Sequence, residues 1–211
     1  MAAYTWPTGR DHTPASMSMG WDVQALTNVS PLNAAAQRVE VPGRRWHAVL
    51  QMPEQRRAAR LALHGYLGKV GGDNLVTLHD MSAPTPRGTC NLTGVTANAA
   101  AAFATSLTLN GCGASTTLLA GDKFSVALTA GGTQLVMVTD DATASGGGVM
   151  AVTIRAMLRG AVSAAAAVVL NAPTTTWRLV DPNISTRWRP GTAGGPIADP
   201  LTIELLEDFS G

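Results

Sequence analysis

The chain has 211 residues, of which 45% are hydrophobic and 14% are charged, so it can bury a sizeable core as one large domain or two small ones. Its 15 basic and 14 acidic side chains nearly balance, which argues against a dedicated nucleic-acid-binding protein, because phosphate contacts need a basic excess. Residues 161–170 form the longest nearly apolar run, too short for a bilayer span, and residues 1–12 show no secretory signal, so we expect a soluble protein without a membrane anchor. A net charge of +1 also leaves little repulsion between copies, which favours self-association.

The first 36 residues and residues 181–200 contain many Pro, Gly and polar residues, so we expect these segments to be too irregular to fold alone. They nevertheless carry large apolar side chains, which a monomer would leave exposed to water. A partner surface would bury these side chains, whereas in the simpler interpretation both segments are mobile ends and loops of a monomer. The apolar residues concerned are Trp6, Trp21, Ile184, Trp188 and Ile197.

Residues 37–51 are expected to form two strands around a turn, because apolar and polar residues alternate on both sides of the Pro-Gly pair at 42–43. A period of two places Trp46 and the alternating apolar residues after it on one face of a sheet. The one strong helix pattern follows, beginning at Pro53 and ending at the glycines 71–72. Its apolar stripe is expected to pack against the Trp46 face at the centre of the core; the stripe consists of Ala59, Leu63, Tyr66, Leu67 and Val70.

Two arginine clusters are candidates for contacts between subunits. Arg44 and Arg45 precede the second strand, and Arg56 and Arg60 are expected on one helix face, opposite the apolar stripe. A solvated face is the simpler interpretation, and ion pairing across subunits, where arginine is enriched, is the functional one. Together with the tryptophans of the irregular segments, the candidate subunit-interface residues are Trp6, Trp21, Arg44, Arg45, Arg56, Arg60 and Trp188.

A shift in composition divides the chain. Residues 90–174 hold only six charges and no Trp, Tyr or His, whereas the flanks hold all five Trp and all four His. One continuous fold rarely separates its aromatic residues so completely, and Pro and Gly residues with linker chemistry lie near both seams. We therefore predict an inserted Ala/Gly/Thr-rich β domain at residues 88–173 and a discontinuous core domain of residues 1–87 and 174–211.

The insert shows the pattern of a small all-β domain. Short apolar or alternating segments at 124–128, 135–138 and 149–154 are separated by glycine turns, which predicts a barrel or sandwich. The Ala-rich stretches at 98–104 and 162–169 are interpreted as loop or strand, with helix as the alternative.

The flanks are expected to contribute further strands at 75–78, 177–180 and 201–206. The predicted fold is therefore mainly β: a β-sandwich core with one packed amphipathic helix, plus an inserted small all-β domain that is barrel-like.

No catalytic, cofactor-binding or metal-binding group can be assembled from the motifs. None of the histidines has HExxH or Cys/His zinc spacing, and the chain lacks a GxSxG elbow and a Walker loop. Asp140 and Asp141 invite an acid–base interpretation, but adjacent strand side chains point to opposite faces and glycines follow, so we expect a solvated turn. Cys90 and Cys112 could form a disulfide, but two cysteines in a chain of this size are expected to be reduced, partly buried thiols. We therefore expect a protein that is not an enzyme and uses no cofactor.

One run of residues resembles a family of phage proteins. It reads Arg38-x-Glu40-x-Pro42-Gly43-x-Arg45-Trp46, and it is followed by a helix that begins Pro-Glu and by a strand that leads to Pro-Thr-Pro-Arg-Gly-Thr. This pattern is similar to that of distal tail or minor tail proteins, small structural proteins at the tail tip of long-tailed bacteriophages and prophages. The segment that starts Leu119-Ala120-Gly121-Asp122-Lys123-Phe124 resembles their inserted β-domain, so the likeness covers most of the chain.

The resemblance implies a structural virion protein that is made in the host cytoplasm and built into the tail tip. It implies a ring, with a hexamer favoured and a trimer possible, that joins the tail tube to the baseplate and host-recognition apparatus. The implied partners are other copies of the chain, the tail tube protein, the tape-measure protein and the tail-tip hub proteins. Contact with DNA in the tail lumen would be passing at most.

Two other function classes stay open at this point. A carbohydrate- or receptor-binding module of the tail tip needs exposed Trp or Tyr residues gathered in one cleft, and the insert offers only Phe103 and Phe124 as aromatic residues. A cell-wall hydrolase needs paired carboxylates or a metal constellation, and the sequence provides neither pattern. The leading expectation is the structural assembly protein.

Overall fold

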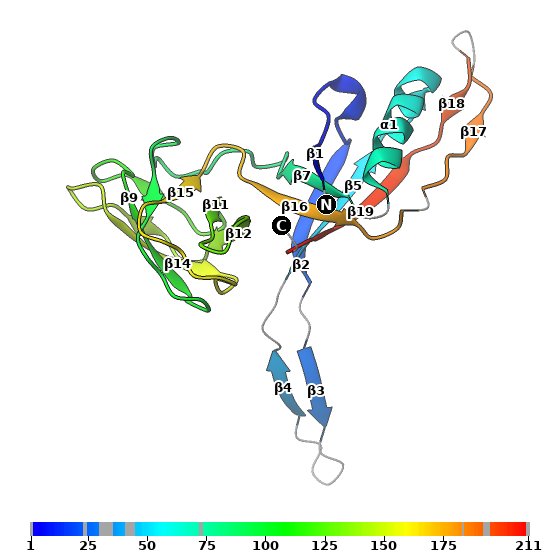
Figure 1. Cartoon of the computed structure of the whole chain (residues 1–211). Coiled ribbons are helices and arrows are strands. Elements are labelled where there is room, and N and C mark those ends of the chain that lie inside the picture. Colours follow the sequence, from blue (N-terminus) through cyan, green and yellow to red (C-terminus); the bar gives the residue numbers. More distant parts are fainter. Residues whose placement is uncertain are drawn as a thin grey trace.

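The computed structural model describes residues 2–22, 25–29, 36–40, 45–71, 74–182, 184–191 and 195–209. The chain is mainly β, with one α-helix in these ranges, several sheets and a closed barrel, so the predicted fold class is confirmed. Figure 1 shows the barrel beside the part that contains the helix. No helix in the described ranges has the length and apolarity to cross a membrane. The predictions for Arg44, for the turn at 42–43 and for Gly72 concern residues outside these ranges.

A six-stranded sheet forms the core part, and it joins segments from both ends of the chain. The pairing is antiparallel except between the first two strands in the order, which are parallel. In order, the strands are β1 (Ala3–Thr5), β7 (Leu75–His79), β16 (Thr174–Leu179), β19 (Leu201–Glu207), β5 (Arg45–Met52) and β2 (Ser16–Asp22).

Alternation along the central strands produces the buried face of this sheet. In β5, Trp46 and every second residue after it are buried, whereas the residues between them are half-buried or exposed. β19 alternates in the same way, with Ile203 and Leu205 buried. Successive side chains of a strand point to opposite faces, so each strand contributes one apolar row to the core.

The helix α1 (Arg57–Val70) packs its apolar stripe into the core cluster, as predicted for Leu63, Leu67 and Val70, all of which are buried. The expected start of the helix at Pro53 is wrong, because the two residues directly before Arg57 form the short strand β6 (Gln55–Arg56). β6 pairs with β18 (Ile197–Ala198), which in turn pairs with β17 (Trp188–Arg189). Pairing with a strand from the far end of the chain holds these residues extended.

The amino-terminal segment is more regular than expected. Residues 1–36 were expected to be too irregular to fold alone, and within the whole chain they contain β1, β2 and the described strand β3 (Ala25–Val29). β3 pairs with β4 (Ala36–Glu40), and Figure 1 shows this two-stranded ribbon standing apart from the rest of the described chain. β2 and β1 exist because they pair with β5 and β7, and not because of a strong local pattern.

The insert contains a closed six-stranded barrel. Its apolar interior includes Phe124 and the buried aliphatic residues of the barrel strands other than Leu135. The Ala-rich stretches contribute extended backbone and no helix: β15 lies in the second, and Ala100 of the first pairs with Val162. In order around the barrel, the strands are β11 (Lys123–Ala127), β12 (Thr133–Val138), β14 (Met150–Arg155), β9 (Ser106–Asn110), β8 (Thr96–Ala97) and β15 (Ala166–Val169); β10 (Thr117–Leu118) and β13 (Ala142–Thr143) pair beside it.

The buried apolar residues fall into two clusters. One draws all its residues from positions 90–170, and the other draws on both flanks and includes Leu135 from the barrel strand β12. Leu135 therefore belongs to the packing between the two parts. Independent folding of the insert and of the discontinuous core stays a prediction.

Candidate functional site

The candidate interface residues lie in three different environments: inside the core, at the joint between the core and the barrel, and on an exposed arm. The arm is the segment 184–200, which carries β17 and β18.

Arg60 lies inside the core, contrary to the expectation of an exposed helix face. Its exposed fraction is 0%, and its Nη2 donates to the carbonyl oxygens of Asp199 (2.7 Å) and Pro53 (3.3 Å). Burial lowers the pKa of Arg60, and the nearby carboxylate of Asp199 opposes this effect. The helix begins at Arg57, so Arg60 is in its first turn and lies under the arm. It fastens the arm to the helix and is not available to another subunit.

Trp6 is also internal. Its ring lies edge-on to that of Tyr66, with centroids 5.5 Å apart, and its Nε1 donates to the carbonyl oxygen of His12 at 3.0 Å. Burial raises the pKa of Tyr66 to about 12. The expectation that a partner must cover Trp6 is therefore wrong, because the chain itself covers this residue.

The joint between core and barrel is built around Trp46. Its Nε1 donates to the carbonyl oxygen of Leu135 in the barrel at 2.9 Å. Trp21 in the neighbouring strand stacks on it, with ring centroids 3.6 Å apart and an interplanar angle of 30°. Trp46 thus belongs to the core cluster, as expected, but its hydrogen bond is directed at the barrel, and Tyr66 of the helix stripe has Trp6 as its ring partner.

A buried carboxylate, Glu207, lies at the centre of this joint. Arg159 of the barrel donates to its Oε1 at 2.8 Å, and so does the hydroxyl of Thr175 at 3.0 Å. The backbone N–H of Trp46 donates to its Oε2 at 3.2 Å. Burial raises the pKa of Glu207, and the charge of Arg159 and the hydrogen bonds oppose the rise. Burial also lowers the pKa of Arg159 to about 10.

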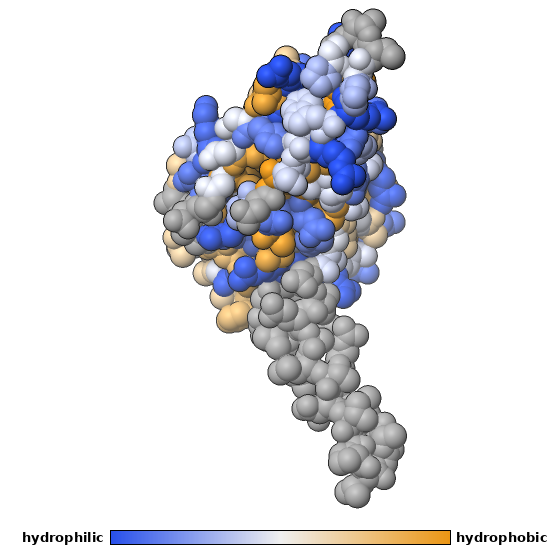
Figure 2. Space-filling model, turned by 90° about the vertical axis from the view of Figure 1, so that its right-hand side faces the viewer, coloured by the Kyte–Doolittle hydropathy of each residue, from blue (hydrophilic) through white to orange (hydrophobic). Residues whose placement is uncertain are grey.

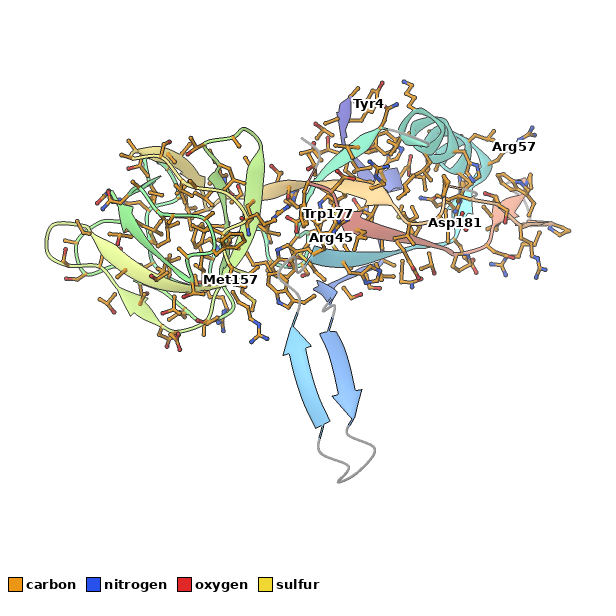
Figure 3. The ribbon with its side chains drawn as sticks, turned by 60° about the horizontal axis from the view of Figure 1, so that its bottom comes forward. Tyr4, Arg45, Arg57, Met157, Trp177 and Asp181 are labelled. Carbon is orange, nitrogen blue, oxygen red and sulfur yellow. The ribbon has the colours of Figure 1, made fainter. Side chains whose placement is uncertain are left out.

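Arg45 takes part in the same joint through Phe209. The guanidinium carbon of Arg159 lies 3.2 Å from the centroid of the Phe209 ring, and that of Arg45 lies 4.8 Å from it. Cations at such distances are attracted to the ring quadrupole. Figure 3 shows Arg45 on the side of the core that faces the barrel. Arg45 therefore contributes to the joint within one chain.

Polar contacts also fix residues 80–88, the linker that runs from the end of β7 in the core into the barrel. Lys123 of the barrel pairs with the buried Asp80 at the end of β7. Burial would raise the pKa of Asp80, but hydrogen bonds from Lys123 and Ser82 and the charge of Lys123 together lower it. Asp122 accepts the backbone N–H of Arg87 at 2.8 Å and that of Gly88 at 3.1 Å.

Gly88 is required where the linker enters the barrel. A Cβ at this position would lie 2.1 Å from the carbonyl oxygen of Thr117, so no side chain fits without a backbone shift. The linker therefore runs in direct contact with the strand β10. Together with Asp122, this contact fixes the path of the chain from core to barrel.

Trp21 and Arg45 were among the predicted site residues, but the other charged residues of the joint were not, although a signal for three of them exists. Asp122, Lys123 and Arg159 are three of the six charges in residues 90–174. An isolated charge in a charge-poor segment is costly to bury unless it is paired, so its presence points to a specific partner. The partners, Asp80 and Glu207, lie in the flanks and have no comparable signal.

The arm carries the exposed candidates. Trp188 in β17 is 40% exposed, and Arg56, which is also exposed, lies in β6 at the opposite edge of the same three-stranded sheet, with β18 between them. In Figure 2 the residues of this face alternate between polar and apolar, with small apolar patches between charged groups. Of the interface candidates with described side chains, these two are the ones that remain accessible to a partner.

The tryptophans do not form a cleft. Trp6, Trp46 and Trp177 are buried, and Trp177 donates through Nε1 to the carbonyl oxygen of Leu78 at 3.0 Å. Trp21 is half-buried in its stack, so Trp188 stands apart from the others as the exposed member of the set.

The described residues contain no group of three or more His, Cys, Asp or Glu side chains placed to hold a metal ion. Asp140 and Asp141 are exposed at a turn, as expected. His64 hydrogen-bonds with Thr186, and its pKa is lowered by burial and by the charge of Arg60. This histidine therefore belongs to the contact between the helix and the arm.

Comparison of the chain with models of protein families found no match, and comparison with curated proteins found none either.

Proposed function

We propose that this protein is a non-enzymatic structural subunit of a phage tail tip, and that copies of it form a ring joining the tail tube to the baseplate and host-recognition apparatus. The observation that carries the proposal is the ribbon β3–β4, which continues the paired strands β2 and β5 and stands apart from the rest of the described chain in Figure 1.

A two-stranded ribbon is marginally stable in water when nothing packs against it. β2, which leads into it, is the last strand of its sheet in the described structure, so one side of its backbone faces no further strand there. Edge strands of this kind are templates for pairing with another chain unless they are short, charged or covered. The sequence of β2, Ser-Met-Ser-Met-Gly-Trp-Asp, has no Lys or Pro to protect it. A neighbouring protein that covers the edge and the ribbon satisfies both requirements.

A second copy of the chain is the neighbour that we propose. Each copy offers an uncovered edge on one side and the exposed arm with Arg56 and Trp188 elsewhere, so contacts between unlike surfaces are available. Such contacts close into a ring when the rotation between copies is a whole fraction of a turn. A hexamer matches the symmetry of a tail tube, and a trimer suits a position nearer the tip. Tail tube, tape-measure and hub proteins are the proposed further partners in the virion.

The joint supports a mechanical role for the insert. Trp46, Asp80 and Glu207 each make a buried polar contact with the barrel, so the barrel is held in a defined orientation on the core. A subunit that transmits position from the tube to the tip needs this kind of fixed connection. The carbohydrate- or receptor-binding alternative receives less support, because only one tryptophan of the described set is exposed.

The experiment is to measure the mass of the purified chain in solution by light scattering after size exclusion. Asp22 and Arg45 are paired in the β2–β5 register, so residues 23–44 can be replaced by an Asn-Gly turn that closes the hairpin directly. We expect the full chain to assemble as a hexamer or trimer. We expect the shortened chain to remain monomeric and to melt cooperatively, as a folded chain without β3 and β4 should.

Two results would contradict the proposal. One is a full chain that stays monomeric at every concentration tested and is found as an isolated monomer in a map of the particle. The other is a shortened chain that assembles as well as the full chain, which would exclude the ribbon as the contact. A point variant tests the second proposed surface. Arg56→Ala should weaken assembly, whereas the matched control Arg155→Ala, which changes an exposed arginine of the barrel, should leave it unchanged.

A further inference from the structure

Two thiols are buried together in the barrel. Cys90 is 4% exposed and Cys112 is 0% exposed, both are free, and both belong to the apolar cluster of the barrel. Buried cysteines often act as small apolar residues.

The backbone holds the two residues side by side. The N–H of Asn91, next to Cys90, donates to the carbonyl oxygen of Cys112 at 3.0 Å, and the side chain of Asn91 donates to the carbonyl oxygen of Gly111 at 3.0 Å. On the other side, the N–H of Cys90 donates to the carbonyl oxygen of Thr117 at 3.1 Å. The two thiols lie close enough to perturb each other, and this mutual interaction raises the pKa of Cys90 and lowers that of Cys112.

The two positions connect different parts of the barrel. Cys90 lies in the entry segment, two residues after the tightly packed Gly88, and Cys112 lies in the turn that follows β9. The turn is itself fixed, because Gly111 has a positive φ of 80° and its Cβ position lies 2.7 Å from the carbonyl oxygen of Gly94. A covalent link would therefore fasten the linker from the core to a rigid turn.

We propose that Cys90 and Cys112 form an intramolecular disulfide when the chain meets a low-molecular-weight disulfide such as oxidised glutathione. One thiolate attacks the glutathione disulfide and releases one glutathione thiol, and the second thiolate then attacks the mixed disulfide and releases the other. The two cysteines lose two protons and two electrons, and oxidised glutathione is reduced to two thiols. The inference rests on the barrel alone and does not depend on the proposed function.

Burial makes this link slow to form in the folded chain and also slow to reduce, because external thiols and disulfides have little access to it. A thiol that is shielded from solvent and disfavoured as a thiolate reacts poorly with external disulfides. The link therefore forms while the chain folds or when the barrel opens. Once formed, it constrains the unfolded chain over residues 90–112 and stabilises the barrel.

The test refolds the full chain from urea in excess oxidised glutathione and measures intact mass, free thiols and the melting temperature. We expect one species with the covalent mass of a single chain and without free thiols or bound glutathione. We expect it to melt roughly 6–12 °C above the form refolded with a phosphine reductant, from the stabilisation typical of a loop of this length. The Cys112→Ala and Cys90→Ala variants retain one thiol each, and we expect each to gain one bound glutathione.

Three results would overturn the proposal. They are a wild-type chain that keeps two free thiols or carries glutathione on both, a chain that forms disulfide-linked dimers, and an internally linked form that melts at or below the reduced form. If an alanine variant fails to fold, the measurement on the wild-type chain still decides the matter, because it compares the same sequence in two redox states.

Discussion

The joint between core and barrel makes a quantitative prediction about Arg159. The Arg159→Met variant leaves the Glu207 carboxylate buried without its opposite charge, while the methionine retains an apolar contact for Phe209. Breaking a buried ion pair in this way costs about 3–5 kcal/mol, and we expect the lower end because the side chain of Arg159 is partly exposed. For a chain of this size, that loss lowers the melting temperature by roughly 6–12 °C.

A second substitution should restore most of the loss. Glu207→Gln removes the buried charge and keeps one oxygen that can accept from the backbone N–H of Trp46, while its new NH2 group lies beside the hydroxyl of Thr175, whose oxygen can accept from it. The Arg159→Met/Glu207→Gln double variant should therefore be more stable than Arg159→Met alone. Urea unfolding of the four proteins gives the interaction energy as the difference between the double variant and the sum of the single variants.

The pH dependence of Arg159→Met provides an independent check. Burial raises the folded-state pKa of Glu207 in the wild type, and loss of Arg159 raises it further. A carboxyl whose pKa is raised on folding contributes stability below its unfolded pKa, about 4.3, and this stability is lost as pH rises through the folded pKa. The variant should therefore lose more stability relative to wild type at pH 8 than at pH 5. An equal loss at both pH values, or a loss below about 0.5 kcal/mol, would refute the buried charge pair.

Three further predictions test the core, the domains and the arm. Leu67→Ala should cost about 2–5 kcal/mol in urea unfolding because Leu67 is buried, whereas Leu61→Ala, at a position that is 52% exposed, should stay within about 0.5 kcal/mol; equal losses would place the helix stripe outside the core. Replacing residues 88–173 by a Gly/Ser linker should leave a core that melts cooperatively but at a lower temperature than the full chain, since its contacts with the barrel are lost; an unfolded circular dichroism spectrum would show that the core depends on the barrel. Trp188→Ala should leave the melting temperature unchanged and weaken self-association in sedimentation velocity, and unchanged association would remove the arm from the proposed interface.

The class of the fold follows from patterns that are local in the chain. Alternation around Trp46 predicted β5, and the stripe of Leu63, Leu67 and Val70 predicted the buried face of α1. Such patterns can be recognised in the sequence because the direction of the side chains repeats every 2 residues in a strand and every 3.6 residues in a helix, whatever packs against them. The low charge of residues 90–174 and their lack of Trp, Tyr and His likewise marked the segment that forms the barrel.

The candidate site depended on contacts between residues that are far apart in the chain, and there the sequence could not decide. Arg60 is a residue type expected on a solvated helix face, yet it is buried because Asp199, 139 residues away in the chain, lies over it. Trp46 and Glu207 are 161 residues apart, and the sequence around neither residue predicts the hydrogen bond between them. The sequence by itself determined which residues are apolar, where they repeat and where the composition changes. Only the tertiary structure decided which polar groups are buried together, because the free energy of burying a charge depends on the partner that folding brings to it.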